Sequence, residues 1–268
     1  MQMSNANNTA EAIDRLRSQA YGFLAAAMEY PEGELTELIR AGDIARKARE
    51  IFCTVHPELD KAIDWNALTE AGEADALSIE YTRLFDVGGA DGPSCALNAG
   101  AAKGDARMGL LEELVRFYNY FGLTAAGTEA NELPDHLTTQ MEFMHYLIFS
   151  ELEAKAAGET ESAGDFIRAQ RDFLNRHPST WIPLLNANLK KSRAPAYYLA
   201  FGELMEQFIR LEQRLLENKV AYLPPPAPHP VVEEEEGYTG AQAQGMDAPT
   251  SVITIHRKAQ QQKAGTPH

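Results

Sequence analysis

The sequence predicts an all-α protein with a single globular multi-helix domain, and three observations support this class. Apolar residues recur at intervals of three and four along many segments, which places them on one face of a helix. No part of the body alternates apolar and polar residues as a half-buried strand does. Glycine and proline stand between the periodic segments. We expect residues 1–8 to form a flexible amino terminus, residues 9–222 the helical domain and residues 223–268 a disordered tail.

The first half of the chain predicts one long helix and several shorter ones. The long helix is expected to start at Asn8, with Glu11 three residues later as in a capping box, and to end at Tyr30-Pro31. Its apolar face carries Ile13, Leu16, Ala20, Phe23, Leu24, Ala27 and Met28. Shorter helices are expected over residues 34–40, 43–55 and 74–85.

A glycine-rich loop separates the two halves. Residues 86–104 contain Gly88, Gly89, Gly92, Gly100 and Gly104 as well as Pro93. This composition argues against a regular element, and a loop of this length is often functional. Asp105 is placed to cap the next helix, which is expected to end at Gly122. The apolar residues of that helix are Met108, Leu111, Val115, Tyr118 and Phe121.

The second half predicts a nearly internal helix followed by three more. Pro134 suits a first helical turn and Asp135 adds negative charge there, so a helix is expected to begin about Pro134 and to end near residue 157. Its apolar residues are Leu137, Met141, Phe143, Met144, Leu147, Ile148 and Phe149. Helices are also expected over residues 165–176, 179–189 and 195–218. The last has a buried face of Tyr198, Phe201, Met205, Phe208, Glu212 and Leu215, with Glu212 as its one polar member.

Composition narrows the classes of partner. The formal net charge is −15, which argues against binding to nucleic-acid phosphates or to an anionic membrane surface and favours basic partners. Neither a secretory leader nor an apolar run of about 18 residues is evident, so we expect a cytoplasmic protein without stable membrane insertion. Cys53 and Cys95 are too few for a disulfide framework or a cysteine-based zinc site.

The tail differs in composition from the body. Proline is concentrated just after Leu223, the acidic run Glu233–Glu236 follows, and glycine, alanine, glutamine, threonine and lysine dominate the remainder. Such a segment cannot bury enough apolar surface to order itself. Residues 251–255 have strand propensity, which makes them a candidate docking segment within the tail.

Three patterns suggest an enzyme, and each is incomplete. Glu142 and His145 have the Glu-x-x-His spacing of carboxylate-bridged di-iron bundles, but the chain has no second such pair. Ser94 and Cys95 follow Gly92-Pro93, but no Gly-x-Ser-x-Gly nucleophile elbow is present. The glycine-rich loop lacks the Gly-Lys-Ser/Thr of a phosphate-binding loop. We therefore assign no catalytic residue and no metal ligand, and we expect no cofactor.

Two short motifs carry a resemblance to a known family. Tyr81-Thr82-Arg83-Leu84-Phe85 matches a Tyr/Trp-x-x-Leu-Phe motif, and Glu132, Asp135 and His136 match a later Glu-Pro-x-Asp-His motif. In the second motif the proline stands one position later, at Pro134, with Leu133 in its place. In this respect the chain resembles the TorD/DmsD/NarJ-type redox-enzyme maturation chaperones over roughly residues 10–222. Tyr81–Phe85 followed by residues 88–93 resembles the subgroup that serves type II molybdenum enzymes of the dimethyl-sulfoxide-reductase family.

The resemblance implies an all-helical chaperone that binds the twin-arginine signal peptide of an apo molybdoenzyme catalytic subunit. Such a chaperone assists insertion of the molybdenum cofactor and delays export until the subunit has folded. The receptor for such a peptide needs carboxylates for the arginines and an apolar groove for the rest. We hypothesise that Glu132 and Asp135 contact the arginines and that His136 orients one carboxylate or the peptide backbone. Tyr81, Leu84 and Phe85 would form or support the apolar wall.

Two other classes stay open at this point. One is an enzyme, either a helical-bundle metalloenzyme that uses Glu142 and His145 or a hydrolase built around residues 86–104. The other is a helical scaffold without a peptide groove, in which the carboxylates form only a solvated face.

Overall fold

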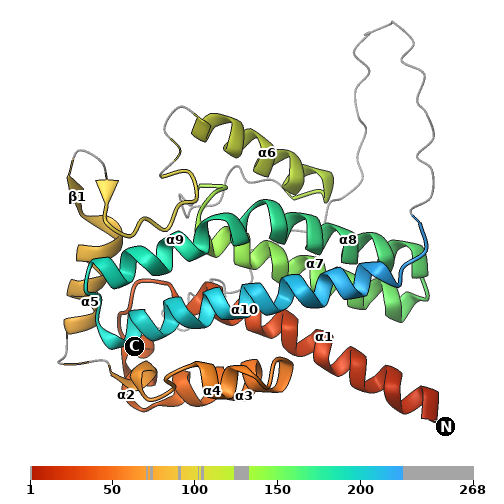
Figure 1. Ribbon diagram of the computed structural model, residues 1–268, viewed down its shortest axis with the longest axis horizontal. Coiled ribbons are helices and arrows are strands. Elements are labelled where there is room, and N and C mark those ends of the chain that lie inside the picture. Colours follow the sequence, from red (N-terminus) through yellow and green to blue (C-terminus); the bar gives the residue numbers. More distant parts are fainter. Residues whose placement is uncertain are drawn as a thin grey trace, which may run out of the picture.

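Figure 1 shows the computed structural model, in which most of the described chain is helical. The structure describes residues 2–70, 72, 75–89, 92–101, 103, 106–123 and 133–225. The longer helices are α1 (Gln2–Ala27), α3 (Asp43–Val55), α6 (Arg107–Tyr120), α7 (Leu137–Ala157), α8 (Thr160–Arg176), α9 (Pro178–Lys191) and α10 (Ala196–Ala221). The shorter helices are α2 (Glu34–Arg40), α4 (Leu59–Ala62), α5 (Ala76–Tyr81), the 3-10 helix η1 (Ala67–Thr69) and the π-helical turn η2 (Thr82–Asp86). The predicted all-α fold is confirmed.

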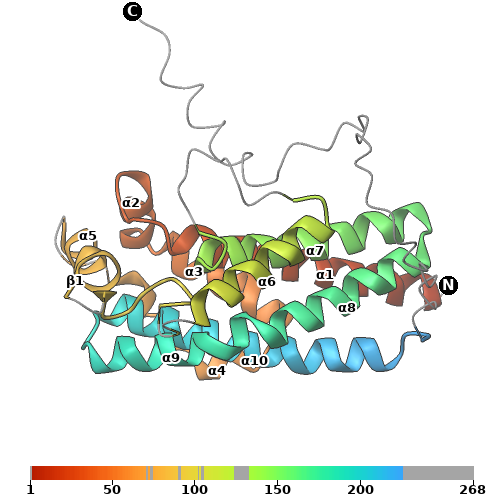
Figure 2. The ribbon, with the colours of Figure 1, turned by 90° about the horizontal axis from the view of Figure 1, so that it is seen from above.

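The long helices α1 and α7 to α10 run broadly along the longest axis of the molecule (Figure 1). Helix α1 packs mainly against α7 and α3, α8 lies between α7 and α10, and α9 packs against α10. In the view of Figure 1, α2, α3 and α4 lie on one side of these helices and α6 on the other. The view from above in Figure 2 shows α6 lying along α7 and α8, and α5 at one end of the molecule beside β1.

Helix bounds agree best with the prediction where glycine separates two segments. Helices α2 and α3 have the expected bounds, and Gly42 between them has a φ of 75°, a conformation that glycine adopts without strain. The prediction is wrong at the amino terminus, because α1 begins at Gln2 and not at Asn8. Residues 2–27 contain no proline, so the helix can extend past Asn8 toward the amino terminus.

The glycine-rich loop contains a small regular element that the composition does not predict. Strands β1 (Gly88–Gly89) and β2 (Gly92–Pro93) pair antiparallel, with Gly88 opposite Pro93. A Cβ placed on Gly88 would lie 1.9 Å from the carbonyl carbon of Gly92. Glycine is therefore required at Gly88 because the two backbones approach too closely for a side chain.

The core is rich in aromatic rings contributed by α10. Phe208 is fully buried and meets Tyr21 of α1 and Phe52 of α3 edge-on, with ring centroids 5.1 and 4.9 Å apart. Edge-on packing of this kind adds about 0.5–1.5 kcal/mol per pair beyond the area buried. The predicted buried face of α10 is confirmed, except that Leu215 is only half-buried.

Helix α6 buries a different face from the one predicted, whereas α7 buries its predicted face apart from one residue. Helix α6 buries Leu110, Leu114 and Tyr118, whereas Met108 is 65% exposed. Phe149, which we expected to broaden the buried face of α7, is 48% exposed. Both helices carry apolar residues on more than one face, so the spacing alone does not decide which face packs inward.

A buried ion pair joins the first and last helices, α1 and α10. The spacing of apolar residues predicts its carboxylate, Glu212, as a buried residue but does not predict its cation. Arg17 and Glu212 are both fully buried, and the guanidinium donates from Nε and Nη2 to the carboxylate, with Nη2–Oε2 at 2.8 Å. Arg17 also donates to Asp14 and Gln170, and His56 Nε2 lies 3.0 Å from Glu212 Oε1. Burial alone would raise the pKa of Glu212, but Arg17 and His56 lower it to about 2.

Two lysines extend this network to the surface. Lys219 of α10 donates to Asp14 and to Glu151 of α7, at 2.6 and 3.0 Å, and Lys155 contacts the same two carboxylates. These pairs and the guanidinium of Arg17 hold the pKa of Asp14 well below its usual range, although burial acts in the opposite direction. Ion pairs thus tie α1, α7 and α10 together inside an otherwise apolar core.

None of the helices in the described part of the chain is both long and apolar enough to span a membrane. The predicted disordered tail falls almost wholly on residues 226–268, which lie outside the described residues, as does the 251–255 segment.

Candidate functional site

One segment of the glycine-rich loop links the two sequence motifs. Cys95 N–H donates to the carbonyl of Leu84 at 2.9 Å, next to the first motif. At its other end, Leu97 C=O accepts from Leu137 N–H at 2.8 Å, and Ala99 N–H donates to Asp135 C=O at 2.9 Å. We call residues 92–101 the strap. The two motifs, some fifty residues apart in the sequence, therefore lie at one corner of the fold because the strap is hydrogen-bonded to both.

The first motif is part of the core at this corner. Tyr81, Leu84 and Phe85 are 8%, 0% and 5% exposed. The Tyr81 hydroxyl donates to the carbonyl of Met28 at the end of α1, and the Tyr81 ring meets Phe85 edge-on with centroids 4.8 Å apart. Phe85 in turn packs on Tyr198 of α10 at 5.3 Å. The motif therefore fixes α5 and η2 against the ends of α1 and α10.

Asp135 holds the strap in place. Its side chain is fully buried, accepts from Asn98 Nδ2 at 3.0 Å and from Gly100 N–H at 2.9 Å, and lies 3.6 Å from Arg107 Nε of α6. A Cβ on Gly100 would lie 2.6 Å from Arg107 Cγ and 2.8 Å from Asp135 Oδ2. Gly100 is thus the residue type that lets the strap approach both charged side chains. We refer to these contacts as the Asp135 clamp.

The start of α7 differs from the prediction because the residues before it pair with the strap. We expected the helix to begin near Pro134, with Asp135 in its first turn, but α7 begins at Leu137 with His136 as its N-cap. His136 pairs with Asn98 as an isolated antiparallel bridge, so the backbone there is extended, with φ −69° and ψ 147°. The bridge to the strap delays the helix to Leu137.

His136 lies at the boundary between this buried clamp and the surface. It is half-buried, and its Nδ1 accepts from Thr138 N–H at 3.3 Å, which fixes a capping role. Burial lowers the pKa of His136, and the neighbouring carboxylates of Asp135 and Asp86 act in the opposite direction. Asp86 is exposed and directly follows the first motif. The sequence reasoning missed Asp86, although its position one residue after Phe85 could have drawn attention to it.

A second anchor lies below the clamp. Gln140 is fully buried on the first turn of α7 and donates from Nε2 to the carbonyl of Asp135 at 3.1 Å. Its Oε1 accepts from the indole N–H of Trp181 on α9, also at 3.1 Å. The corner is therefore tied to α9 as well as to α6 and the strap.

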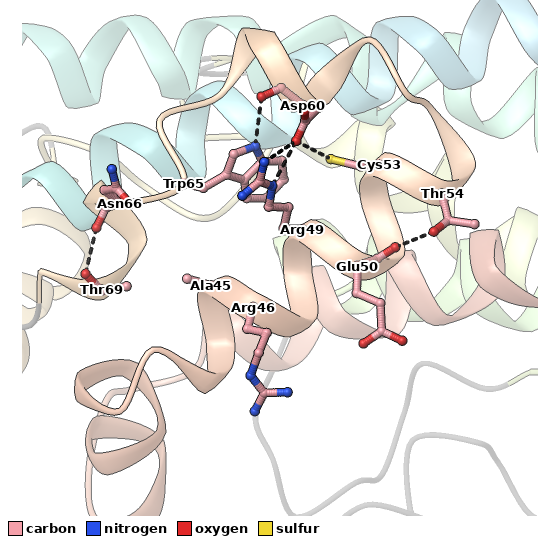
Figure 3. Close-up of a pocket in the computed structure, with 10 residues that line it drawn as sticks. All are labelled: Ala45, Arg46, Arg49, Glu50, Cys53, Thr54, Asp60, Trp65, Asn66 and Thr69. Carbon is pink, nitrogen blue, oxygen red and sulfur yellow. Dashed lines mark hydrogen bonds and ion pairs between the residues drawn. The ribbon is translucent and has the colours of Figure 1, made fainter.

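A separate hollow of about 490 Å³ opens between α3 and the segment that carries α4 and η1. Figure 3 shows the Asp60 carboxylate facing Arg49 and Cys53. Arg49 Nε donates to Asp60 at 2.8 Å, and Trp65 Nε1 donates to the Asp60 carbonyl at 3.3 Å. Burial, and then the charge of Asp60, raise the pKa of the Cys53 thiol to about 11, so the thiol is not activated as a nucleophile.

Comparison with known proteins identifies the family. The family described as nitrate reductase delta subunit matches residues 46–187. The chain belongs to this family. The match begins within α3 and ends within α9, so it contains both motifs, the strap and the Asp135 clamp.

Three relatives that resemble this chain carry names that describe an assembly role. The chain is 41% identical over 128 residues to the perchlorate reductase assembly chaperone protein of Dechloromonas aromatica, 37% over 151 residues to the selenate reductase assembly chaperone protein of Thauera selenatis, and 34% over 159 residues to the chlorate reductase assembly chaperone protein of Ideonella dechloratans. These alignments cover 47%, 53% and 56% of this chain and 56%, 76% and 79% of the respective relatives. The resemblance to redox-enzyme maturation chaperones is confirmed.

The predicted site residues differ in their placement. Asp135, Tyr81, Leu84 and Phe85 are buried and engaged within the protein, and His136 is half-buried. Glu132 lies outside the described residues. In this conformation the Asp135 carboxylate has its own partners and no exposed surface, so its predicted contact with client arginines is not available without opening of the clamp. The predicted peptide-binding role of these residues stays a prediction.

The alternative metal pair takes part in helix packing. His145 Nδ1 lies 2.8 Å from both the hydroxyl and the carbonyl oxygen of Ser18 on α1. Within the part of the chain that the structure describes, no group of three or more histidine, cysteine or acidic side chains is arranged to hold a metal ion. His145 therefore helps to hold α7 against α1.

Proposed function

We propose that this chain is a cytoplasmic assembly chaperone for the catalytic subunit of a molybdenum-dependent oxyanion reductase and is not itself an enzyme. The observation that carries this proposal is that three relatives at 34–41% identity are named as assembly chaperones of perchlorate, selenate and chlorate reductases. The shared family supports transfer of the role, because the matched region holds the whole corner at which the two motifs meet.

We further propose that the chain binds the twin-arginine leader of that subunit. A leader of this kind presents guanidinium groups followed by an apolar stretch, and carboxylates bind guanidinium groups through paired, charge-assisted hydrogen bonds. The formal net charge of −15 supports recognition of such a cation, since it raises the local concentration of a positively charged peptide.

The exposed rim of the motif corner is the binding site we favour. Asp86 is exposed beside His136, and Val87 and Leu133 next to them are 62% and 44% exposed. A carboxylate flanked by exposed apolar side chains matches a peptide that is both cationic and apolar. We propose that Asp86 and Glu132 meet the arginines and that His136 lies against the peptide. Asp135, Tyr81, Leu84 and Phe85 act as positioning residues that hold this rim together.

Titration of the purified chain with synthetic leader peptides tests the proposal. The probes are the leaders of perchlorate, selenate and chlorate reductase catalytic subunits, each also made with Lys-Lys in place of Arg-Arg. We expect at least one Arg-Arg leader to bind, the Lys-Lys form to bind more weakly because lysine cannot pair bidentately, and binding to weaken as salt rises. No binding to any leader, or equal binding of both forms, would contradict leader recognition.

Variants then locate the site. Asp86→Asn and Glu132→Gln are each expected to weaken leader binding by about tenfold, which corresponds to about 1.4 kcal/mol and one charge-assisted hydrogen bond. Glu153→Gln, which changes an exposed carboxylate of α7, is the matched control and should leave affinity unchanged. Equal losses in all three variants would show that net charge alone, and not the rim, governs binding.

A further inference from the structure

A second hollow carries positive charge on this acidic protein. It has a volume of about 470 Å³, lies between α8 and α10, and is lined by Asn175, Arg210, Gln213, Arg214, Glu217 and Asn218. Arg210 and Arg214 are exposed and one turn apart, so their side chains lie on one face of α10. Within the described residues neither forms an ion pair, and Arg210 donates to Gln207. Glu217 is held by Asn175 Nδ2 at 2.9 Å. The hollow is therefore suited to an anion.

The chain leaves the described fold close to this hollow. Helix α10 ends at Ala221 beside the start of α8 (Figure 2). Arg168 of α8 donates to the carbonyl of Pro224, and Leu223 lies against α8, 3.7 Å from a Cβ placed on Gly164. These contacts place Leu223 and Pro224 against α8, one of the two helices that line the hollow.

The residues that follow supply a matching anion within reach. After Pro225 the sequence contains further prolines and then Glu233–Glu236. A proline-rich segment extends by about 3.1 Å per residue, so Glu233 can lie up to about 25 Å from Pro225. Arg214 and Arg210 lie roughly 10 and 16 Å back along α10 from its end, at ~1.5 Å per residue. The acidic run can therefore reach both arginines.

We propose that Glu233–Glu236 docks in the α8/α10 hollow of the same chain and pairs with Arg210 and Arg214. The two guanidinium groups provide donors for several carboxylates. The amides of Asn175 and Gln213 already donate to Glu217 and to Asn175 Oδ1, so the arginines carry the proposed contact. A short tether gives the run an effective concentration in the millimolar range, which favours it over a separate acidic partner. The tail then covers the hollow, and its carboxylates compensate charges that the described fold leaves unpaired.

Cross-linking of the full chain tests this contact. In the Arg214→Lys variant the positive charge is kept, and a carbodiimide joins the new amine to any carboxylate that it touches. We expect peptide mapping to find amide links from position 214 to Glu233–Glu236, and to find several-fold fewer of them in high salt. The matched control is Arg116→Lys on the exposed face of α6, which should give roughly tenfold fewer links to the run.

Three outcomes would overturn the proposal. The first is a set of links from position 214 that is confined to close neighbours such as Glu217. The second is equal linking of the run to positions 214 and 116, which would indicate a segment without a preferred site. The third is links of mixed mass when ¹⁵N-labelled and unlabelled chains are combined, because these would mean that the run of a second copy occupies the hollow. The exposed, charge-conserving substitutions should leave the fold intact.

Discussion

The Asp135 clamp makes a quantitative prediction about stability. In the unmodified chain Asn98 Nδ2 and Gly100 N–H donate to the Asp135 carboxylate at 3.0 and 2.9 Å. In Asp135→Asn one acceptor oxygen remains, and the new amide group faces one of these two donors. Hydrogen bonds to a charged group contribute about 1.5–3 kcal/mol, and a buried donor left unpaired costs about 1–3 kcal/mol. We therefore expect the free energy of unfolding to fall by about 2–4 kcal/mol, measured by urea denaturation.

Gly100→Ala perturbs the same clamp without changing its charge. The added methyl group would lie 2.6 Å from Arg107 Cγ and 2.8 Å from Asp135 Oδ2, so the strap must shift, at a cost of about 1–3 kcal/mol. If Asp135 acts only by positioning the strap, both variants should weaken leader binding by similar factors. If Asp135 contacts the client arginines directly, Asp135→Asn should lose far more affinity than Gly100→Ala.

An exposed aspartate supplies the control for this pair. Asp172 of α8 pairs with Arg171 at the surface, where an ion pair contributes less than about 1 kcal/mol. Asp172→Asn should therefore leave both stability and leader affinity close to those of the unmodified chain. An Asp135→Asn variant that is as stable as the Asp172→Asn control would refute the clamp as the reason for the buried carboxylate.

Two further predictions concern acid stability. The pKa of Glu212 in the folded chain is about 2 against 4.5 for the free side chain, so its stabilising effect is complete above pH 4.5 and is lost as pH falls through 2. Urea denaturation of Glu212→Gln between pH 5 and 2 should show a pH dependence smaller by about 3 kcal/mol, whereas a profile parallel to that of Glu153→Gln would refute the pairing with Arg17. Burial lowers the pKa of His177 to about 4 in the folded chain, against 6.5 for the free side chain. As pH falls from 6.5 to 4, His177 therefore gains a proton in the unfolded chain but not in the folded chain, and the free energy of unfolding decreases. In His177→Phe the decrease in the free energy of unfolding between pH 6.5 and 4 should be smaller by roughly 3 kcal/mol. An unchanged pH dependence over this range would show that His177 is not held neutral in the folded chain.

The helices were predictable where local sequence decides them. Gly42 separates α2 from α3 because it adopts a φ of 75°, and Pro178 stands at the first position of α9, where its missing N–H is not needed. The segment between α3 and α5 was not predicted, because α4 and η1 are only four and three residues long and give too few turns for a periodic pattern. Short helices depend on tertiary contacts that the local sequence does not carry.

The buried ion pair illustrates a limit of apolar periodicity. Arg17 stands on the face of α1 that packs inward, yet its partner lies 195 residues later in the chain. The available signal was Glu212, which interrupts the apolar face of α10 and therefore needs a buried cation. The identity of that cation follows only from the packing of α1 against α10.

The motif corner shows the same division between local and distant information. The residue types of the second motif indicated a site. However, the Asp135 carboxylate accepts its hydrogen bonds from Asn98 and Gly100 of the strap. Residue spacing predicts only an irregular loop for the strap, so these contacts could not be foreseen. A buried carboxylate with three partners can hold a rim in shape, whereas a peptide needs a carboxylate that still has exposed oxygens. Asp86 meets that need, because it is exposed beside His136 and directly follows the first motif. The two motifs therefore account for the hydrogen bonds that hold the strap in place, and the exposed residues that adjoin them carry the proposed recognition of a cationic peptide.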